Sequence, residues 1–235
     1  MDEQPFPQKG ILQCNLNLKL KEIRTKFCQA QSAEVYVYVL STVEFAEDKK
    51  RFVQTGSAPN FQGNYVTLCT CKRYMRSLRK VDDWENIWIA GFTGHKLGQN
   101  YLFYLMQVEY AFGSFRELWK AGALPAATKQ AKNASRNSLG DLFHPLSNKG
   151  DDFSVQSYEP PMEGHVHQPN EWHIDIEYKN QWRKRAPVLV GNPKFSFLWD
   201  QPQILFCSPR KQRRGHWRYN NLQDFCSTLK TNPAA

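Results

Sequence analysis

Short β-forming segments alternate with polar stretches along this chain, and the alternation predicts many strands and few helices. Residues 12–20 alternate leucine or cysteine with polar side chains in period two, which is typical of a half-buried strand. Branched and aromatic residues, which favour strands, dominate several further segments. We expect strands there at residues 34–42, 65–70, 86–90, 101–110, 172–178, 187–190, 194–198 and 203–207.

Signals for helices are sparse. Ser114 and Glu117 form a capping box ahead of apolar residues, which predicts a short helix from Ser114. A last helix is expected at residues 222–229, and residues 126–140 form either a loop or a weak helix. Residues 143–170 are rich in Pro, Gly, Asp and His and are expected to be irregular. This pattern predicts an α+β fold, a small mixed and partly closed β-barrel with flanking helices.

The positive charge of the chain is concentrated near its end. Residues 179–218 hold ten Lys or Arg and one acid, Asp200, a surplus that equals the whole formal net charge of +9. Such a run is either a solvated face or a surface for an anionic partner, and here aromatic residues are interleaved with the cations. We therefore expect DNA or a nucleotide as partner, with RNA left open. The predicted phosphate-binding residues are Lys72, Arg210, Lys211, Arg213, Arg214, His216 and Arg218.

Cysteine usage and hydropathy bear on the compartment. The six cysteines would suit disulfides in a secreted protein, but the first residues lack the basic and apolar regions of a signal peptide. No apolar run approaches the length of a membrane span. We therefore expect reduced thiols, a cytoplasmic location and no membrane partner, with the oligomeric state open. The predicted organisation is an N-terminal extension at residues 1–33, with an edge strand as one reading, followed by one domain at residues 34–235.

The most distinctive stretch is residues 56–79, where a turn-prone segment leads through a β-rich one into a cluster of cations. Its run Ala58-Pro59-Asn60-Phe61, followed by Leu68-Cys69-Thr70-Cys71-Lys72, resembles the signature of the second numbered nucleotide modification associated domain family. Arg76 matches the arginine of that family, and Asp83-Trp84 matches the middle of its next turn. The resemblance extends from about residue 34 to the C-terminal helix.

This resemblance carries expectations of fold and function. The family is similar to proteins found beside DNA base-hypermodification genes in viruses of bacteria and related mobile elements. The succession of its elements also resembles PUA-like barrels, to which the EVE and YTH readers of modified bases belong. In that picture a base would be bound by Asn60, Phe61, Asn64, Arg76, Asp83, Trp84, Trp88 and Phe92. The alternative is that the Asn residues shape a turn and the aromatic side chains pack in a core.

A second group of residues suits acid–base chemistry. His144, His165 and Asp175 are the catalytic candidates, because histidine titrates near neutral pH. They equally suit loop residues that bind backbone groups. We expect no metal, since Cys69 and Cys71 lack a second cysteine pair at ligand spacing, and no cofactor, since no dinucleotide or phosphate-loop motif is present.

Three functional hypotheses follow. The first is recognition or processing of modified nucleobases in DNA. The second is an enzyme of nucleotide or DNA base modification that uses the His and Asp groups. The third is a basic adaptor for nucleic acid or protein without a base pocket.

Overall fold

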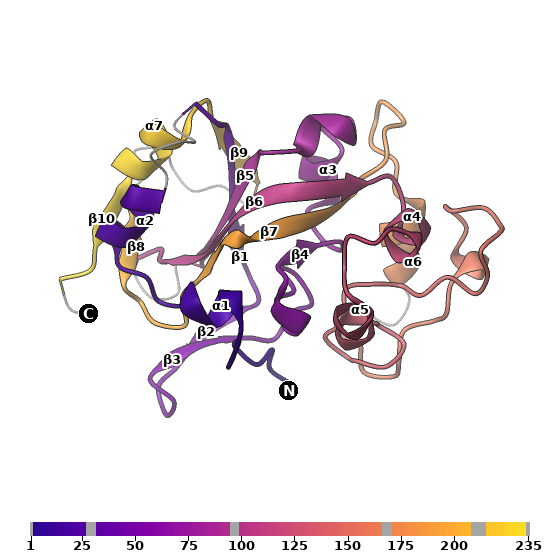
Figure 1. Cartoon of the computed structure of the whole chain (residues 1–235), viewed down its shortest axis with the longest axis horizontal. Helices are drawn as coiled ribbons and strands as arrows, with labels where there is room; N and C mark the ends of the chain where they lie inside the picture. Colours follow the sequence, from indigo (N-terminus) through magenta and orange to yellow (C-terminus); the bar gives the residue numbers. More distant parts are fainter. Residues whose placement is uncertain (1, 27–31, 95–98, 166–170, 208–214, 234–235) are drawn as a thin grey trace. The chain divides into compact units, whose positions relative to one another are not determined.

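The computed structural model describes the chain except residues 1, 27–31, 95–98, 166–170, 208–214 and 234–235. Its main element is a curled, mixed sheet of six strands in the order β4-β7-β6-β5-β1-β9 (Figure 1). The α+β, partly closed barrel predicted from the sequence is confirmed. The six strands are β1 (Val35–Leu40), β4 (Thr67–Leu68), β5 (Trp88–Thr93), β6 (Leu102–Phe112), β7 (Val188–Leu198) and β9 (His216–Tyr219).

Two small antiparallel pairs accompany this sheet. One joins β2 (Val43–Ala46) to β3 (Arg51–Gln54), and the other joins β8 (Ile204–Phe206) to β10 (Leu229–Thr231). The helices are short: α1 (Ile11–Cys14), α2 (Leu20–Lys26), α3 (Arg73–Arg76), α4 (Phe115–Lys120), α5 (Ala126–Lys132), α6 (Trp172–Glu177) and α7 (Leu222–Ser227). Single 3-10 turns are η1 (Gln62–Asn64), η2 (Asp82–Trp84) and η4 (Val155–Ser157).

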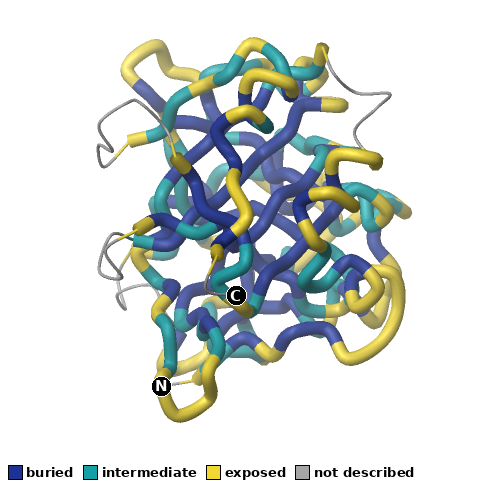
Figure 2. The backbone as a smooth tube through the Cα atoms, turned by 90° about the vertical axis from the view of Figure 1, so that its left-hand side faces the viewer, coloured by how far each residue is buried: buried dark blue, intermediate teal, exposed yellow. Residues whose placement is uncertain are grey.

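The chain divides into two compact units, each assembled from three separate stretches. The first unit comprises Met1–Phe6, Thr55–Glu85 and Val108–Asn192, and the second comprises Pro7–Gln54, Asn86–Gln107 and Pro193–Ala235. Buried backbone follows the strands, and exposed backbone is concentrated in the loops (Figure 2).

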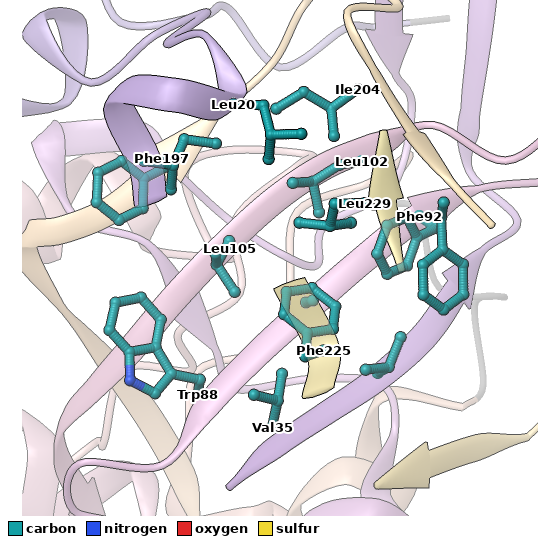
Figure 3. Close-up of a cluster of buried hydrophobic side chains, with 14 of the residues drawn as sticks. Leu20, Val35, Trp88, Phe92, Leu102, Leu105, Phe197, Ile204, Phe225 and Leu229 are labelled. Atoms are coloured by element: carbon teal, nitrogen blue, oxygen red, sulfur yellow. The ribbon is translucent and has the colours of Figure 1, made fainter. Parts of the chain in front are cut away.

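The core of the second unit is rich in aromatic side chains. Trp88 lies stacked on Phe197 with ring centroids 6.4 Å apart, and Phe92 lies on Phe206 at 4.0 Å (Figure 3). Leu20 and Ile23 of α2 belong to the same cluster, so the residues before β1 contribute to this core. The first unit has its own cluster, built around Phe115, Phe143 and Tyr158 and other buried apolar residues.

A close approach between strands explains one glycine in the second unit. β5 lies parallel to β1 and antiparallel to β6. A Cβ atom at Gly91 would lie 2.3 Å from the ring of Tyr104 on β6. The hydroxyl of Tyr104 in turn is 2.8 Å from the hydroxyl of Tyr38 on β1. A side chain at position 91 would therefore displace a buried, hydrogen-bonded tyrosine pair.

Several predicted elements are confirmed. The strands expected at residues 34–42, 86–90, 101–110 and 203–207 correspond to β1, β5, β6 and β8. The helix at Ser114 is α4, and the Ser114 hydroxyl accepts a hydrogen bond from the Glu117 amide at 3.1 Å. The weak helix at residues 126–140 is α5, and the last helix is α7.

Other predictions were wrong. Residues 12–20, expected as a strand, contain α1 and the start of α2. The leucines that alternate with polar residues also recur four residues apart, a spacing that suits a helix. In addition, the side chain of buried Asn15 donates to the carbonyls of residues 193, 194 and 196. Residues 172–178, also expected as a strand, form α6, which places Trp172 and Ile176 on one face towards the first unit's core. The two strands expected at 187–190 and 194–198 are one strand, β7. The strand expected at 65–70 is reduced to β4, and residues 216–219, at the end of the basic stretch and not expected as a strand, form β9.

Candidate functional site

The Pro59–Thr67 loop of the family-like stretch is built around a buried lysine of α5. The Lys132 Nζ atom donates to the Asn60 carbonyl at 2.9 Å, the Asn60 Oδ1 at 2.7 Å and the Tyr65 carbonyl at 2.9 Å. It also donates to the Thr67 hydroxyl at 2.9 Å, and that hydroxyl donates to Asp141 Oδ2 at 2.8 Å. We call Asn60, Thr67, Lys132 and Asp141 the Lys132 hub; all four side chains are fully buried.

Burial also governs the protonation of the hub. Loss of solvation lowers the pKa of Lys132 to about 8, although the Asp141 carboxylate opposes the shift. Loss of solvation raises the pKa of Asp141. The Lys132 charge and the hydrogen bond from the Thr67 hydroxyl both lower it, but by less. The ammonium and the carboxylate therefore stabilise each other inside a medium that penalises both.

The hub fixes the loop that contains the predicted base-reading residues. The Asn60 side-chain NH₂ group donates to the Leu139 carbonyl at 2.8 Å. Asn60 Oδ1 accepts from the backbone amide of Gln62 at 3.0 Å as well as from Lys132. Gly63 is in the left-handed region, with φ of 66°, and a Cβ there would lie 2.8 Å from the Cα of Thr128. Asn60 therefore holds the loop onto α5 and the segment that follows α5.

Phe61 and Asn64 lie in the same loop. The Phe61 ring is stacked on Phe6 at 5.0 Å, and its backbone amide donates to the side chain of Gln4. Asn64 is half-buried and has a φ of 63°, a backbone conformation that asparagine tolerates better than most residues. Their assignment to a base pocket stays a prediction.

Arg76 of α3 is also fully buried, and it joins three segments of the first unit. It donates to the carbonyls of Cys71 and Pro187, and its Nη2 lies 3.9 Å from Asp175 Oδ1. The same Asp175 oxygen accepts from the Cys71 amide at 3.2 Å and lies 3.4 Å from Arg73 Nη1. Asp175, a predicted catalytic residue, is therefore placed by α6 as the carboxylate partner of two arginines.

Three of the residues predicted to bind a base, Trp84, Trp88 and Phe92, are fully buried. Trp84 donates its indole N–H to the Arg76 carbonyl at 3.0 Å within the first unit. Trp88 and Phe92 both belong to the core of the second unit (Figure 3). Their ring faces contact other side chains of the protein in this structure.

The remaining predicted ligand-binding residues that the structure describes are exposed or partly buried. Asp83 in η2 is exposed, and Lys72 precedes α3 with a φ of 43° and a pKa lowered by burial. Arg218 on β9 is half-exposed and lies 3.3 Å from Glu34 Oε1, and His216 on the same strand is partly buried. Arg210, Lys211, Arg213 and Arg214 lie outside the described residues.

His144 forms a partly exposed pair with Glu159 in the first unit. Its Nδ1 atom lies 2.9 Å from Glu159 Oε1, and 37% of the His144 side chain is exposed. The Nδ1 atom itself is buried, so the exposure belongs to the rest of the ring. Hydrogen bonds from Ser135 and His144 lower the pKa of Glu159, with a smaller contribution from the Arg136 charge.

The backbone holds this pair in register. Pro145 and Tyr158 form an antiparallel bridge, and the Glu159 amide donates to the His144 carbonyl at 2.8 Å. Ser135, placed by the Asn133 side chain, donates to Glu159 Oε2 at 2.7 Å. The ring of Trp119 meets that of His144 edge-on, with centroids 4.6 Å apart. We call His144, Glu159, Ser135 and Trp119 the His144 site.

The three predicted catalytic residues have different partners. His144 pairs with Glu159, Asp175 pairs with Arg73 and Arg76, and His165 is buried with its ring 6.2 Å from Phe143. Sequence reasoning missed Glu159 and Ser135, because neither belongs to a motif with His144. The available signal was Glu159 itself, the single acid between Tyr158 and Pro160. This stretch pairs with the residues after His144 through the bridge between Pro145 and Tyr158.

The cysteines and acids give no metal-binding cluster within the described residues. Burial raises the pKa of Cys69 well above its usual value and that of Cys71 to about 11, so both are held as thiols at neutral pH. Within the same residues, no helix combines the length and apolar character needed to cross a membrane.

Comparison with known families identifies the family to which the chain belongs. A family model described as Nucleotide modification associated domain 2 matches residues 33–201, and the chain belongs to that family. Searches of the curated proteins and of the solved structures gave no match.

Proposed function

We propose that this protein processes modified nucleobases in DNA or nucleotides, with His144 as the group that transfers a proton. Membership of the family associates the chain with nucleotide modification. The observation that carries the proposal is the pairing of a partly exposed histidine with a carboxylate at 2.9 Å. That arrangement is common to general acids and bases in enzymes.

The chemistry follows from the two ring nitrogens of His144. Glu159 Oε1 lies 2.9 Å from Nδ1, and its negative charge favours the tautomer that carries the proton on Nδ1. The lone pair is then on Nε2, on the side of the ring away from Glu159. Nε2 accepts a proton from a substrate, and the Glu159 charge stabilises the resulting imidazolium. The lowered pKa of Glu159 keeps this carboxylate ionised at neutral pH.

The surroundings of His144 suit a nucleotide. Arg136 is exposed and acts electrostatically on Glu159, so it supplies positive charge near the pair. The Trp119 ring against His144 supplies an aromatic wall, and aromatic rings are the side chains on which bases stack. A substrate with both a phosphate and a base would use both.

The experiment is a conversion assay with defined variants. The protein is incubated with DNA that contains a hypermodified pyrimidine, and separately with the matching free nucleotides, and the digested products are analysed by mass spectrometry. We expect His144→Asn to reduce conversion by roughly 10²–10⁴-fold, the usual contribution of general acid–base catalysis. Glu159→Gln should give a smaller loss and a changed pH–rate profile, because the imidazolium loses its carboxylate partner.

A matched control separates this role from a general effect on folding. His173→Asn changes another half-buried histidine, in α6, and should leave the rate unchanged. Retention of activity by His144→Asn to within about threefold would overturn the role of His144. If no substrate is converted while binding still discriminates modified from ordinary strands, recognition replaces processing as the function.

A further inference from the structure

Two exposed aromatic side chains of the first unit lie next to each other. Tyr74 of α3 is 47% exposed and Trp182, in the loop before β7, is 56% exposed. Their ring centroids are 6.4 Å apart and their planes are inclined by 31°. Burial of large aromatic rings is favourable, so an exposed pair indicates a surface that a ligand covers. We call Tyr74 and Trp182 the aromatic pair.

The loop that carries Trp182 is fixed by its own hydrogen bonds. The Asn180 side-chain oxygen accepts from the backbone amides of Trp182 and Lys184, each at 2.9 Å. The Asn180 amide group donates to the Ser77 hydroxyl at 3.0 Å, directly after α3. Arg183 adopts a φ of 58° within this turn. The same asparagine therefore shapes the turn and attaches it to the segment that carries Tyr74.

Cations flank Trp182 in the sequence. The loop contains Lys179, Arg183 and Lys184, all exposed, and no acid between residues 178 and 186. In the part of the chain that the structure describes, none of these three takes part in an ion pair. Arg73, next to Tyr74, lies over the ring of Tyr178 at 5.9 Å. Positive charge therefore accompanies the exposed rings and is available to an anion.

This combination discriminates between kinds of partner. Exposed rings provide stacking surfaces for bases, and the flanking Lys and Arg provide contacts for phosphates. A duplex offers phosphates but keeps its bases stacked internally, so it would leave the rings uncovered. An acidic protein surface would use the cations but has no reason to require two adjacent flat rings.

We propose that the aromatic pair and Lys179, Arg183 and Lys184 form a binding surface for single-stranded nucleic acid. Unpaired bases stack on Trp182 and Tyr74, and the cations of the loop contact the phosphates on either side. This inference rests on the proposed function and deepens it, because it specifies that the nucleic-acid substrate is single-stranded. It does not require catalysis by His144, and its test is a binding measurement.

The test is fluorescence anisotropy with a labelled oligothymidine of roughly 12 nucleotides, a length in the range that such surfaces cover. Trp182→Ala and Tyr74→Ala should each raise the dissociation constant by roughly 5- to 150-fold, the effect of losing one stacked base. Trp182→Phe should restore much of the affinity because it keeps a flat ring. Tyr110→Ala, at another exposed tyrosine with 39% exposure, is the matched control and should bind as the parent protein does.

Salt titration separates stacking from charge. Trp182→Ala should leave the slope of log affinity against log salt unchanged, whereas Lys184→Ala should reduce that slope by about 0.7. Tyr74 and Trp182 are about half exposed, so their replacement should leave the fold intact. Thermal melting of each variant checks this. Unchanged binding by Trp182→Ala, or equal effects of that change on a matched duplex, would overturn the proposal.

One further variant keeps this result distinct from the proposed function. His144→Asn is assayed for conversion, and Trp182→Ala is assayed for binding. If His144→Asn abolishes conversion and Trp182→Ala leaves binding intact, the function stands and the aromatic pair is not its binding surface. If Trp182→Ala weakens binding while His144→Asn leaves conversion intact, the surface stands and the catalytic assignment is wrong.

Discussion

Replacement of Lys132 by methionine tests whether the loop at Asn60 depends on one buried charge. Methionine keeps most of the apolar stem of lysine but removes all four hydrogen bonds of Nζ. The Asn60 carbonyl, the Asn60 Oδ1 and the Tyr65 carbonyl each lose a donor inside the protein. Asp141 loses the positive charge that stabilises its buried carboxylate.

The magnitude follows from these losses. Removal of one member of a buried ion pair costs about 3–5 kcal/mol, because the other charge stays buried. The lost hydrogen bonds add about 1–3 kcal/mol in all, because the Asn60 carbonyl and Oδ1 keep the backbone amides of Thr67 and Gln62 as donors. Relief of the lysine's own desolvation offsets part of that cost. We expect a net loss of about 3–5 kcal/mol in the free energy of unfolding. For a chain of this size that lowers the melting temperature by roughly 6–20 °C.

The assay is urea unfolding followed by circular dichroism, with Lys120→Met as a control at an exposed position of α4. The control should change stability by less than about 0.5 kcal/mol. The double change Lys132→Met with Asp141→Asn should be less destabilising than the sum of the two single changes, since no charge is then left unpaired. A loss below about 1 kcal/mol for Lys132→Met, or strict additivity of the pair, would refute the reasoning.

Two further outcomes follow from the same region. The pKa of Lys132 is lowered from 10.5 to about 8 in the folded protein. Between these two pH values the unfolded chain therefore binds more protons than the folded protein does. The stability advantage of the parent protein over Lys132→Met should consequently grow as pH rises from about 8 to 10.5. Unfolding curves of both proteins at pH values across that range check this, and a difference that is flat or shrinks with pH contradicts it. Asn60→Ala should lower the melting temperature and weaken binding to ordinary and modified oligonucleotides by the same factor, because Asn60 is buried and bonded to Lys132 and Leu139. A selective loss for the modified strand would instead place Asn60 in a base pocket.

The strands with the strongest local signal were predictable from the sequence. β1, β5 and β6 are rich in branched and aromatic residues, which fit the half-buried surface of a sheet. The start of α4 was predictable because its cap is local, with Ser114 and Glu117 three residues apart. The segments at 12–20 and 172–178 were predicted wrongly, because Asn15 and Asp175 form buried polar contacts with residues far away in the sequence.

The candidate sites were harder to predict for a related reason. Lys132 lies in a polar, alanine-rich stretch, where a lysine is normally exposed, and nothing nearby in the sequence indicates that α5 packs against the Asn60 loop. Glu159 and His144 meet through backbone pairing across an irregular segment that has no periodic pattern. Trp182 belongs to a basic run in which the sequence does not distinguish an exposed ring from a packed one. Contacts that depend on tertiary structure leave little trace in local patterns.

The extent of the family match and the extent of the second core differ. The match ends at residue 201, whereas Phe206, Phe225 and Leu229 pack in the same cluster as Trp88 and Phe92 (Figure 3). The matched stretch of sequence is therefore not a complete folding unit in this chain. A fragment that stops at residue 201 would present those aromatic faces to water and would be prone to aggregate. The residues after position 201 therefore act as a cover for apolar surface that the matched stretch itself presents.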